Sequence, residues 1–176
     1  MKGDRVQVDT DRPRFDGTQG PRIIGPDDGE AVDLGTLGAR FMVWTAESGG
    51  GFSLVEHPIA PRHLVAPLHR HSREDEYSYV VEGRMGAQLG DDVVVVEAGD
   101  LVFKPRDQWH TFWNAGDGPC RILEIISPGG FEQFFADLAA GTLAPEQVGA
   151  RYGLEFDFDS VPRLCAEHGL VFPLER

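Results

Sequence analysis

The chain has 176 residues, 41% hydrophobic and 26% charged, which is typical of a folded globular protein and not of a disordered or membrane chain. Its 16 basic and 29 acidic residues give a net charge of −13. This argues against nucleic acid or an anionic membrane as a partner, because either requires a basic surface. No apolar run approaches the roughly 18 residues that cross a membrane, and no apolar signal segment follows Met1, so we expect a cytoplasmic protein.

In chain order, residues 1–22 are polar, contain Pro and Gly, and show only weak periodicity, which predicts an N-terminal arm. Residues 23–127 contain short apolar runs separated by Gly, Pro and Asp turns. The expected strands are 41–45, 52–56, 77–81, 85–89, 93–96, 101–104, 111–113 and 121–126. Strands at this spacing, with no helical pattern between them, predict an all-β sandwich or barrel.

Residues 128–176 predict a C-terminal helical extension. Phe131, Phe134, Phe135 and Leu138 share one helical face, and Gly141 follows where a helix would end. Two further helices are expected over 145–153 and 160–169, each ending at a glycine followed by leucine. The aromatic face is expected to pack against the barrel, with a lid over its mouth as the alternative.

Two histidines, His69 and His71, are two positions apart. In a helix they would point in nearly opposite directions, whereas in a strand they lie on one face. Residues 72–75 are polar and suit a turn, after which Glu76 opens the next strand with Ser78 on its face. The two histidines and Glu76 can therefore converge from adjacent strands.

A third histidine, His110, follows a turn marked by Pro105 and Asp107, and Phe112 and Asn114 share its face. Three imidazoles and one carboxylate are costly to bury without a partner, and a cation would satisfy all of them. We therefore predict one divalent transition metal ion (Fe, Mn, Ni, Co, Cu or Zn) held by His69, His71, Glu76 and His110.

These two segments resemble the paired motifs of the cupin superfamily. The matching residues are His69, His71, Glu76 and Gly83 in the first motif, and Gly99, Pro105, His110 and Asn114 in the second. The chain departs from the family at His63 and Asp107, where the family has glycine. The resemblance implies a single cupin double-stranded β-helix, or jelly-roll barrel, over 23–127, and barrels paired in a homodimer.

The segment 127–141 adds a similarity to the small quercetin-dioxygenase-like group, in which a C-terminal helix packs by the barrel mouth. That likeness implies a metal-dependent dioxygenase acting on a small aromatic or enolisable compound, with Glu76 as both ligand and catalytic base. An oxygen-independent isomerase or cyclase and a non-catalytic small-molecule-binding protein are the alternatives.

The remaining candidate pocket residues follow from strand parity. Ser78 would leave room beside the ion and Phe112 would give an apolar wall. Asn114 would either orient a ligand or close the barrel. His57 and His168 lie outside these patterns and are expected at the surface or in a helix cap.

Overall fold

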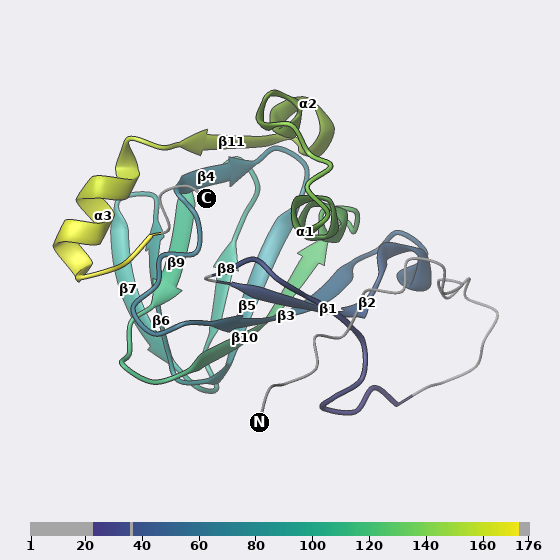
Figure 1. Cartoon of the computed structure of the whole chain (residues 1–176), viewed down its shortest axis with the longest axis horizontal. Coiled ribbons are helices and arrows are strands. Elements are labelled where there is room, and N and C mark those ends of the chain that lie inside the picture. The colour runs from purple at the N-terminus through teal and green to yellow at the C-terminus, as the bar shows by residue number, and fades with distance from the viewer. Residues whose placement is uncertain (1–22, 36, 173–176) are drawn as a thin grey trace.

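The computed structural model describes residues 23–35 and 37–172, so the predicted arm over 1–22 lies outside the described residues. Two antiparallel β-sheets face each other and enclose the core, and short helices lie around them (Figure 1). The prediction of an all-β barrel with short C-terminal helices is confirmed.

The first sheet has six strands in the order β1-β2-β3-β10-β5-β8. Their bounds are β1 Glu30–Asp33, β2 Gly38–Val43, β3 Ser53–Ile59, β10 Cys120–Ser127, β5 Asp75–Glu82 and β8 Leu101–Lys104. Strand β10 alternates buried and more exposed residues along its length, as expected for a strand with one face on a core. Strand β1 was not predicted.

The second sheet has five strands in the order β11-β4-β9-β6-β7. Their bounds are β11 Leu154–Asp157, β4 Leu68–His71, β9 His110–Asn114, β6 Arg84–Leu89 and β7 Asp92–Glu97. Strand β11 belongs to the segment expected to be helical, yet it pairs with β4 over its whole length. The extension therefore adds an edge strand to the barrel as well as helices.

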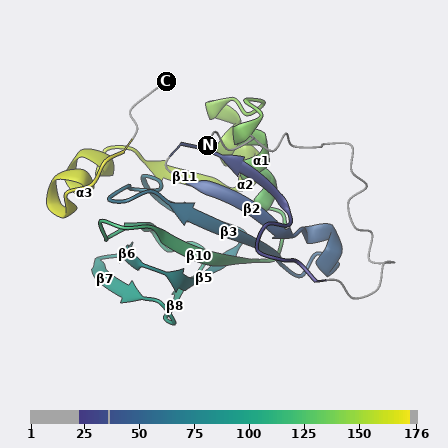
Figure 2. The same cartoon turned by 60° about the horizontal axis from the view of Figure 1, so that its bottom comes forward.

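Among the described residues, three α-helices and two 3-10 turns accompany the sheets: α1 Glu132–Ala139, α2 Val148–Tyr152, α3 Ser160–His168, η1 Thr45–Ser48 and η2 Pro145–Gln147. Helices α2 and α3 end at Gly153 and Gly169, both left-handed, as the sequence predicts. In both views α3 lies on the opposite side of the barrel from α1 and α2 (Figures 1 and 2). Helices α1 and α2 contribute Phe134, Phe135 and Val148 to the wall of the cavity that is described below.

The core lies between the sheets. Fully buried aliphatic side chains such as Val55, Val80 and Ile122 come from the first sheet, and Met85 from the second. Burying each stabilises the fold by about 1.5–3 kcal/mol. Gly83, in the first motif, has φ +79°, and a Cβ there would collide with the Pro119 carbonyl oxygen, so the turn requires glycine.

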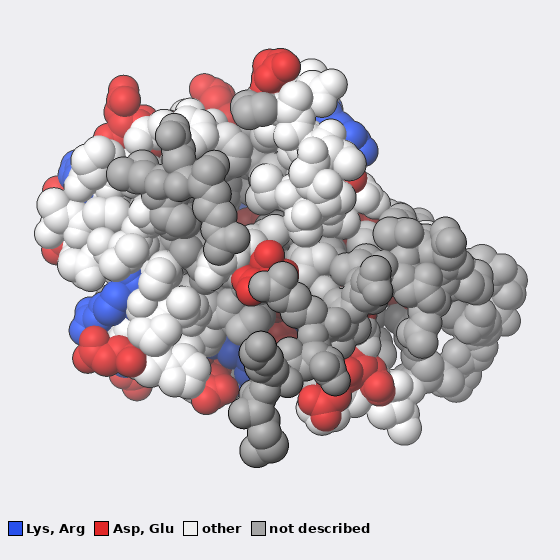
Figure 3. Space-filling view, in the orientation of Figure 1, with Lys and Arg blue, Asp and Glu red and all other residues white. Residues whose placement is uncertain are grey.

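The surface reflects the acidic composition. On the face in Figure 3 the Lys and Arg side chains lie in separate places and form no continuous basic surface. Within residues 23–35 and 37–172, no helix is long and apolar enough to span a membrane.

Candidate metal centre

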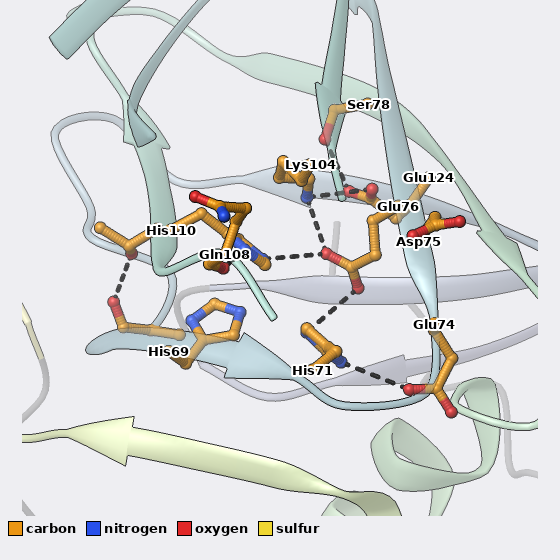
Figure 4. A network of polar contacts seen from close by, with 12 residues as sticks. His69, His71, Glu74, Asp75, Glu76, Ser78, Lys104, Gln108, His110 and Glu124 are labelled. Carbon is orange, nitrogen blue, oxygen red and sulfur yellow. Dashed lines mark hydrogen bonds and ion pairs between the residues drawn. The ribbon is translucent and has the colours of Figure 1, made fainter. Parts of the chain in front are cut away.

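Four buried side chains from both sheets converge inside the barrel. His69 and His71 come from β4, His110 from β9 and Glu76 from β5, and their ligand atoms all lie within 4.8 Å of one another. Each residue is at most 6% exposed. Figure 4 shows the three imidazoles and the carboxylate turned toward one another. The structure thus brings together the four residues that the sequence proposed as ligands.

Strand pairing explains this convergence. His69 lies directly opposite His110 in the β4–β9 ladder, and His71 follows two residues later on the same face. Glu76 sits on the inner face of β5 in the facing sheet. The observed strand therefore agrees with the expectation from the i, i+2 spacing that His69 and His71 share one face.

The backbone fixes the ring orientation of two histidines. His69 Nδ1 lies 2.8 Å from the Pro67 carbonyl oxygen, and His110 Nδ1 lies 3.0 Å from that of Gln108. A carbonyl oxygen only accepts, so each Nδ1 must donate a proton and each Nε2 keeps its lone pair for a ligand. Burial lowers the pKa of both His69 and His110, and so favours the neutral form that a metal requires.

The third histidine has a charged neighbour in place of a carbonyl. His71 Nδ1 lies 3.8 Å from Oε2 of Glu74, a carboxylate only 6% exposed. Phe131 packs edge-on against the His71 ring, with centroids 4.4 Å apart. The ring is packed by Phe131 with Glu74 nearby, and its Nε2 lies 3.5 Å from Glu76 Oε1.

Behind Glu76 lies a buried network that the sequence interpretation missed. Lys104 Nζ is 3.0 Å from Glu76 Oε2 and 3.0 Å from Glu124 Oε1, and Ser78 Oγ donates to Glu124 Oε2 at 2.8 Å (Figure 4). Burial alone would lower the pKa of Lys104, but the two carboxylates raise it above its usual value. Lys104 is therefore a buried cation beside the candidate ligand Glu76.

The alternation along β8 and β10 places Lys104 and Glu124 on the inner faces of their strands, but it does not show that the two side chains pair. Val102 and Lys104 share the inner face of β8, and Glu124 lies between the inward residues Ile122 and Ile126 of β10. Leu101 and Phe103 are apolar yet about half exposed, so hydrophobicity alone does not show which face of β8 is buried.

The four residues fit a divalent transition metal ion. Ligand atoms about 2.0–2.2 Å from an ion lie up to about 4.4 Å apart, close to the separation observed. Within the described part of the chain, His71 Nε2 and His110 Nε2 are buried without a hydrogen-bond partner. Buried polar atoms are rarely left unpaired, and an ion would satisfy both. The cluster can thus hold a metal, and imidazole with carboxylate suits several first-row ions.

A cavity of about 380 Å³ adjoins the cluster. Four titratable side chains line it, His57, His69, Glu76 and Glu124, and every other lining residue is apolar. Phe131, Phe134, Phe135 and Leu138 of the α1 segment form part of its wall. The aromatic face of α1 therefore also forms part of the cavity wall, and the cavity extends to two candidate ligands, His69 and Glu76.

The candidate pocket residues take different places. Phe112 lines the cavity, whereas Ser78 is fully buried and directed at Glu124. Asn114 donates to the carbonyl oxygens of Ile59 and Gly118, so it ties loops together at the barrel end.

The two motif departures lie outside the named strands, Asp107 in a turn and His63 in an isolated bridge with Val171. Asp107 has φ +64°, so aspartate occupies the left-handed position where the family has glycine. His63 lies in the loop before β4, with Nδ1 2.7 Å from the Pro61 carbonyl oxygen.

The surface expectation for His57 is wrong. It is 1% exposed, lines the cavity, and its Nδ1 donates to the Gly38 carbonyl oxygen at 2.8 Å. Burial lowers its pKa to about 4. His168 ends α3 and stacks on Trp113, consistent with a cap position.

Comparison with known proteins agrees with this geometry. Residues 56–126 match the family described as "Cupin domain". The structure of KdgF from Halomonas sp. superposes with a TM-score of 0.57 at 16% identity, over 65% of this chain and 99% of that one. The barrel has the cupin fold.

Two curated relatives match in sequence. The tetracenomycin polyketide synthase protein TcmJ of Streptomyces glaucescens is 33% identical over 70 residues, 40% of this chain and 46% of that protein. The polyketide synthase CurC of Streptomyces cyaneus is 35% identical over 60 residues, 34% of this chain and 39% of that protein. The match to this chain therefore spans less than half the length of each relative.

Proposed function

We propose that this protein is a mononuclear metal enzyme that acts on a small aromatic or enolisable compound, with dioxygen as co-substrate. One observation carries the proposal: His69 and Glu76 belong to the four-residue cluster and also line the apolar cavity. An ion held by the cluster would therefore be in reach of a compound in the cavity.

The cavity chemistry supports this class of substrate. Among the described residues that line it there is no Lys or Arg, so it offers no side-chain cation to a phosphate or carboxylate. The apolar wall instead suits a flat, largely apolar compound with one oxygen atom directed at the ion. The two relatives are named as polyketide synthase proteins, and a polyketide is both enolisable and apolar in large part.

Each element of the site has a proposed task. His69, His71, Glu76 and His110 would hold the ion, which supplies Lewis-acid polarisation and an open coordination position. Phe112, Phe131 and Phe134 would orient the ring system and exclude water. The resemblance also makes Glu76 the base that takes the substrate proton.

Oxygen uptake tests the proposal. Metal-free protein is loaded in turn with Fe²⁺, Mn²⁺, Co²⁺ and Ni²⁺, and offered flavonols and 1,3-diketones in an oxygen electrode. We expect oxygen uptake with at least one combination of metal ion and compound. His110→Ala should lose this uptake, and the loop control His63→Ala should retain it. The absence of uptake with every pair would contradict an oxygenase.

An oxygen-independent cyclase or isomerase is the second candidate, and the polyketide synthase relatives favour it. The same loaded protein, incubated without oxygen, separates the two. Substrate consumption under anaerobic conditions supports the cyclase or isomerase, and consumption that requires oxygen supports the oxygenase. Tight binding of the compound without conversion in either atmosphere supports a non-catalytic binding protein.

We also propose that the chain forms a homodimer through the outer face of β5, β8 and β10. Tyr79, Leu101, Phe103 and Ile125 are all at least 36% exposed there, and the register places them side by side. Between two copies that each carry −13, an uncharged face is where repulsion is smallest. Sedimentation should give a dimer that Phe103→Glu dissociates; a monomeric wild type would contradict this.

A further inference from the structure

His57 is a buried polar side chain that the proposed chemistry leaves without a task. It lies on β3, is 1% exposed, and lines the cavity from the six-stranded sheet. Phe135 of α1 packs against its ring, with centroids 4.8 Å apart and an angle of 64° between the planes. A polar ring is therefore held at a fixed place in a wall that is otherwise mostly apolar.

The two ring nitrogens of His57 have different surroundings. Nδ1 lies 2.8 Å from the Gly38 carbonyl oxygen, and because a carbonyl oxygen only accepts, Nδ1 carries a proton. Among residues 23–35 and 37–172, no group forms a hydrogen bond with Nε2. Nε2 is also not one of the fully enclosed unpaired atoms, so it borders the open space that the ring lines. Since burial keeps the ring neutral at pH 7, Nε2 presents an unused hydrogen-bond acceptor to the cavity.

The other polar side chains of the cavity wall are occupied. Two of them belong to the candidate metal centre. Glu124 accepts from Ser78 Oγ at 2.8 Å on one oxygen, and its other oxygen lies 3.0 Å from Lys104 Nζ. Of the described side chains that line the cavity, His57 is thus the one that offers a polar atom without a partner outside the metal centre.

His57 and Glu76 are well separated on the sheet that carries them both. On β10, which lies between their strands, Ile122 is opposite His57 and Ile126 is opposite Glu76. Their Cα atoms are therefore about 13 Å apart along the strands and about 10 Å apart across them. Both side chains nevertheless line one cavity. A compound with one oxygen at the candidate metal centre would reach His57 Nε2 only with a second polar group remote from the first.

We propose that His57 Nε2 accepts a hydrogen bond from a second hydroxyl of the bound compound, and so selects phenols of two or three linked rings with one oxygen at the metal and a hydroxyl remote from it. The inference rests on the proposed binding of an aromatic compound at the metal centre. A compound without the second hydroxyl leaves Nε2 against an apolar surface, and an unpaired buried acceptor is costly.

Equilibrium binding of matched flavonols to the chain loaded with redox-inert Zn²⁺ tests the inference without turnover. The probe 3-hydroxyflavone carries only the hydroxyl for the metal, whereas 3,7-dihydroxyflavone and 3,4′-dihydroxyflavone add a second one on different rings. The wild type should bind at least one dihydroxy compound about 10-fold more tightly than 3-hydroxyflavone. His57→Leu should bind the same two compounds with nearly equal affinity.

Two further variants separate the acceptor from the rest of the wall. His57→Asn can still donate to the Gly38 carbonyl oxygen but has no atom in the place of Nε2, so it should lose the preference as His57→Leu does. Phe134→Leu also changes the cavity wall, and it should alter the affinity for both compounds together and keep their ratio.

The outcomes distinguish this inference from the proposed function. A preference that persists in folded His57→Leu or His57→Asn overturns the inference, because another group then receives the second hydroxyl. If neither variant folds, the wild type still decides: dihydroxy compounds that bind no more tightly than 3-hydroxyflavone overturn the role of His57 alone. Absence of 3-hydroxyflavone binding to the loaded wild type overturns the proposed function itself.

Discussion

The two sheets position their residues of the candidate metal centre in different ways. On the five-stranded sheet, the Nδ1 atoms of His69 and His110 donate to backbone carbonyl oxygens. On the six-stranded sheet, Glu76 lies within a buried network of charged side chains. The histidine side depends on local geometry, since each carbonyl belongs to the residue two positions earlier. The position of the Glu76 carboxylate depends on the network with Lys104 and Glu124, which come from two other strands. The rings of His69 and His110 are thus fixed locally, whereas the candidate ligand Glu76 is fixed by long-range ion pairs.

The largest effect is expected on the carboxylate side, from Lys104→Met. The substitution leaves the buried Glu76 and Glu124 carboxylates without their shared cation, and breaking a buried pair in this way costs about 3–5 kcal/mol. Urea unfolding of the metal-free protein measures the loss. Lys104→Met combined with Glu124→Gln should recover part of it, because one of the two unpaired charges is then removed. A loss below about 1 kcal/mol would mean that the network contributes little.

The next effect concerns pH. The pKa of His57 is about 4 in the folded protein, against an ordinary value of 6.5 for an exposed histidine, so between these values the unfolded chain binds more protons than the folded one. The part of the stability that His57 contributes should be fully present above pH 6.5 and fall by about 3 kcal/mol as the pH drops toward 4. Unfolding of the metal-free protein across this range checks the slope. The difference in unfolding free energy between the wild type and His57→Gln isolates this contribution, because the other buried titratable groups are common to both proteins. A difference that does not change between pH 6.5 and 4 would contradict it.

A smaller effect is expected at Glu74, the charged neighbour of His71. Glu74→Gln removes the carboxylate 3.8 Å from His71 Nδ1 and should weaken Zn²⁺ binding by about 10-fold. Competition with a chelating dye measures the change. Glu82→Gln is the matched control, because Glu82 ends the strand that follows Glu74 and its side chain is half exposed. Unchanged affinity in Glu74→Gln would show that Phe131 alone holds the His71 ring.

The same contrast explains what the sequence could predict. The common face of His69 and His71 follows from strand parity, because an i, i+2 spacing on a strand fixes it regardless of the rest of the fold. Glu76 and His110 lie on other strands, and the match to the paired cupin motifs is what joined them to the two histidines. Lys104 and Glu124 occupy inward positions within apolar runs, and their pairing depends on which strands become neighbours. The order of the strands in the sheet is set only when the barrel assembles, so no local sequence pattern predicts which of these side chains will pair.

Two strands were missed for a related reason. β1 and β11 have four residues each and form against strands already in the sheet, β2 and β4. A four-residue run carries too little alternation to distinguish a strand from a loop. The helices of the extension were easier to predict, since left-handed Gly153 and Gly169 end two of them.

The central claim is that His69, His71, Glu76 and His110 bind one metal ion, and elemental analysis of protein purified without added metal tests it most directly. The wild type and the loop control His63→Ala should each carry close to one transition metal ion per chain after dialysis. His110→Ala should carry far less while keeping its circular dichroism spectrum. Equal metal content in folded wild type and His110→Ala would contradict the account.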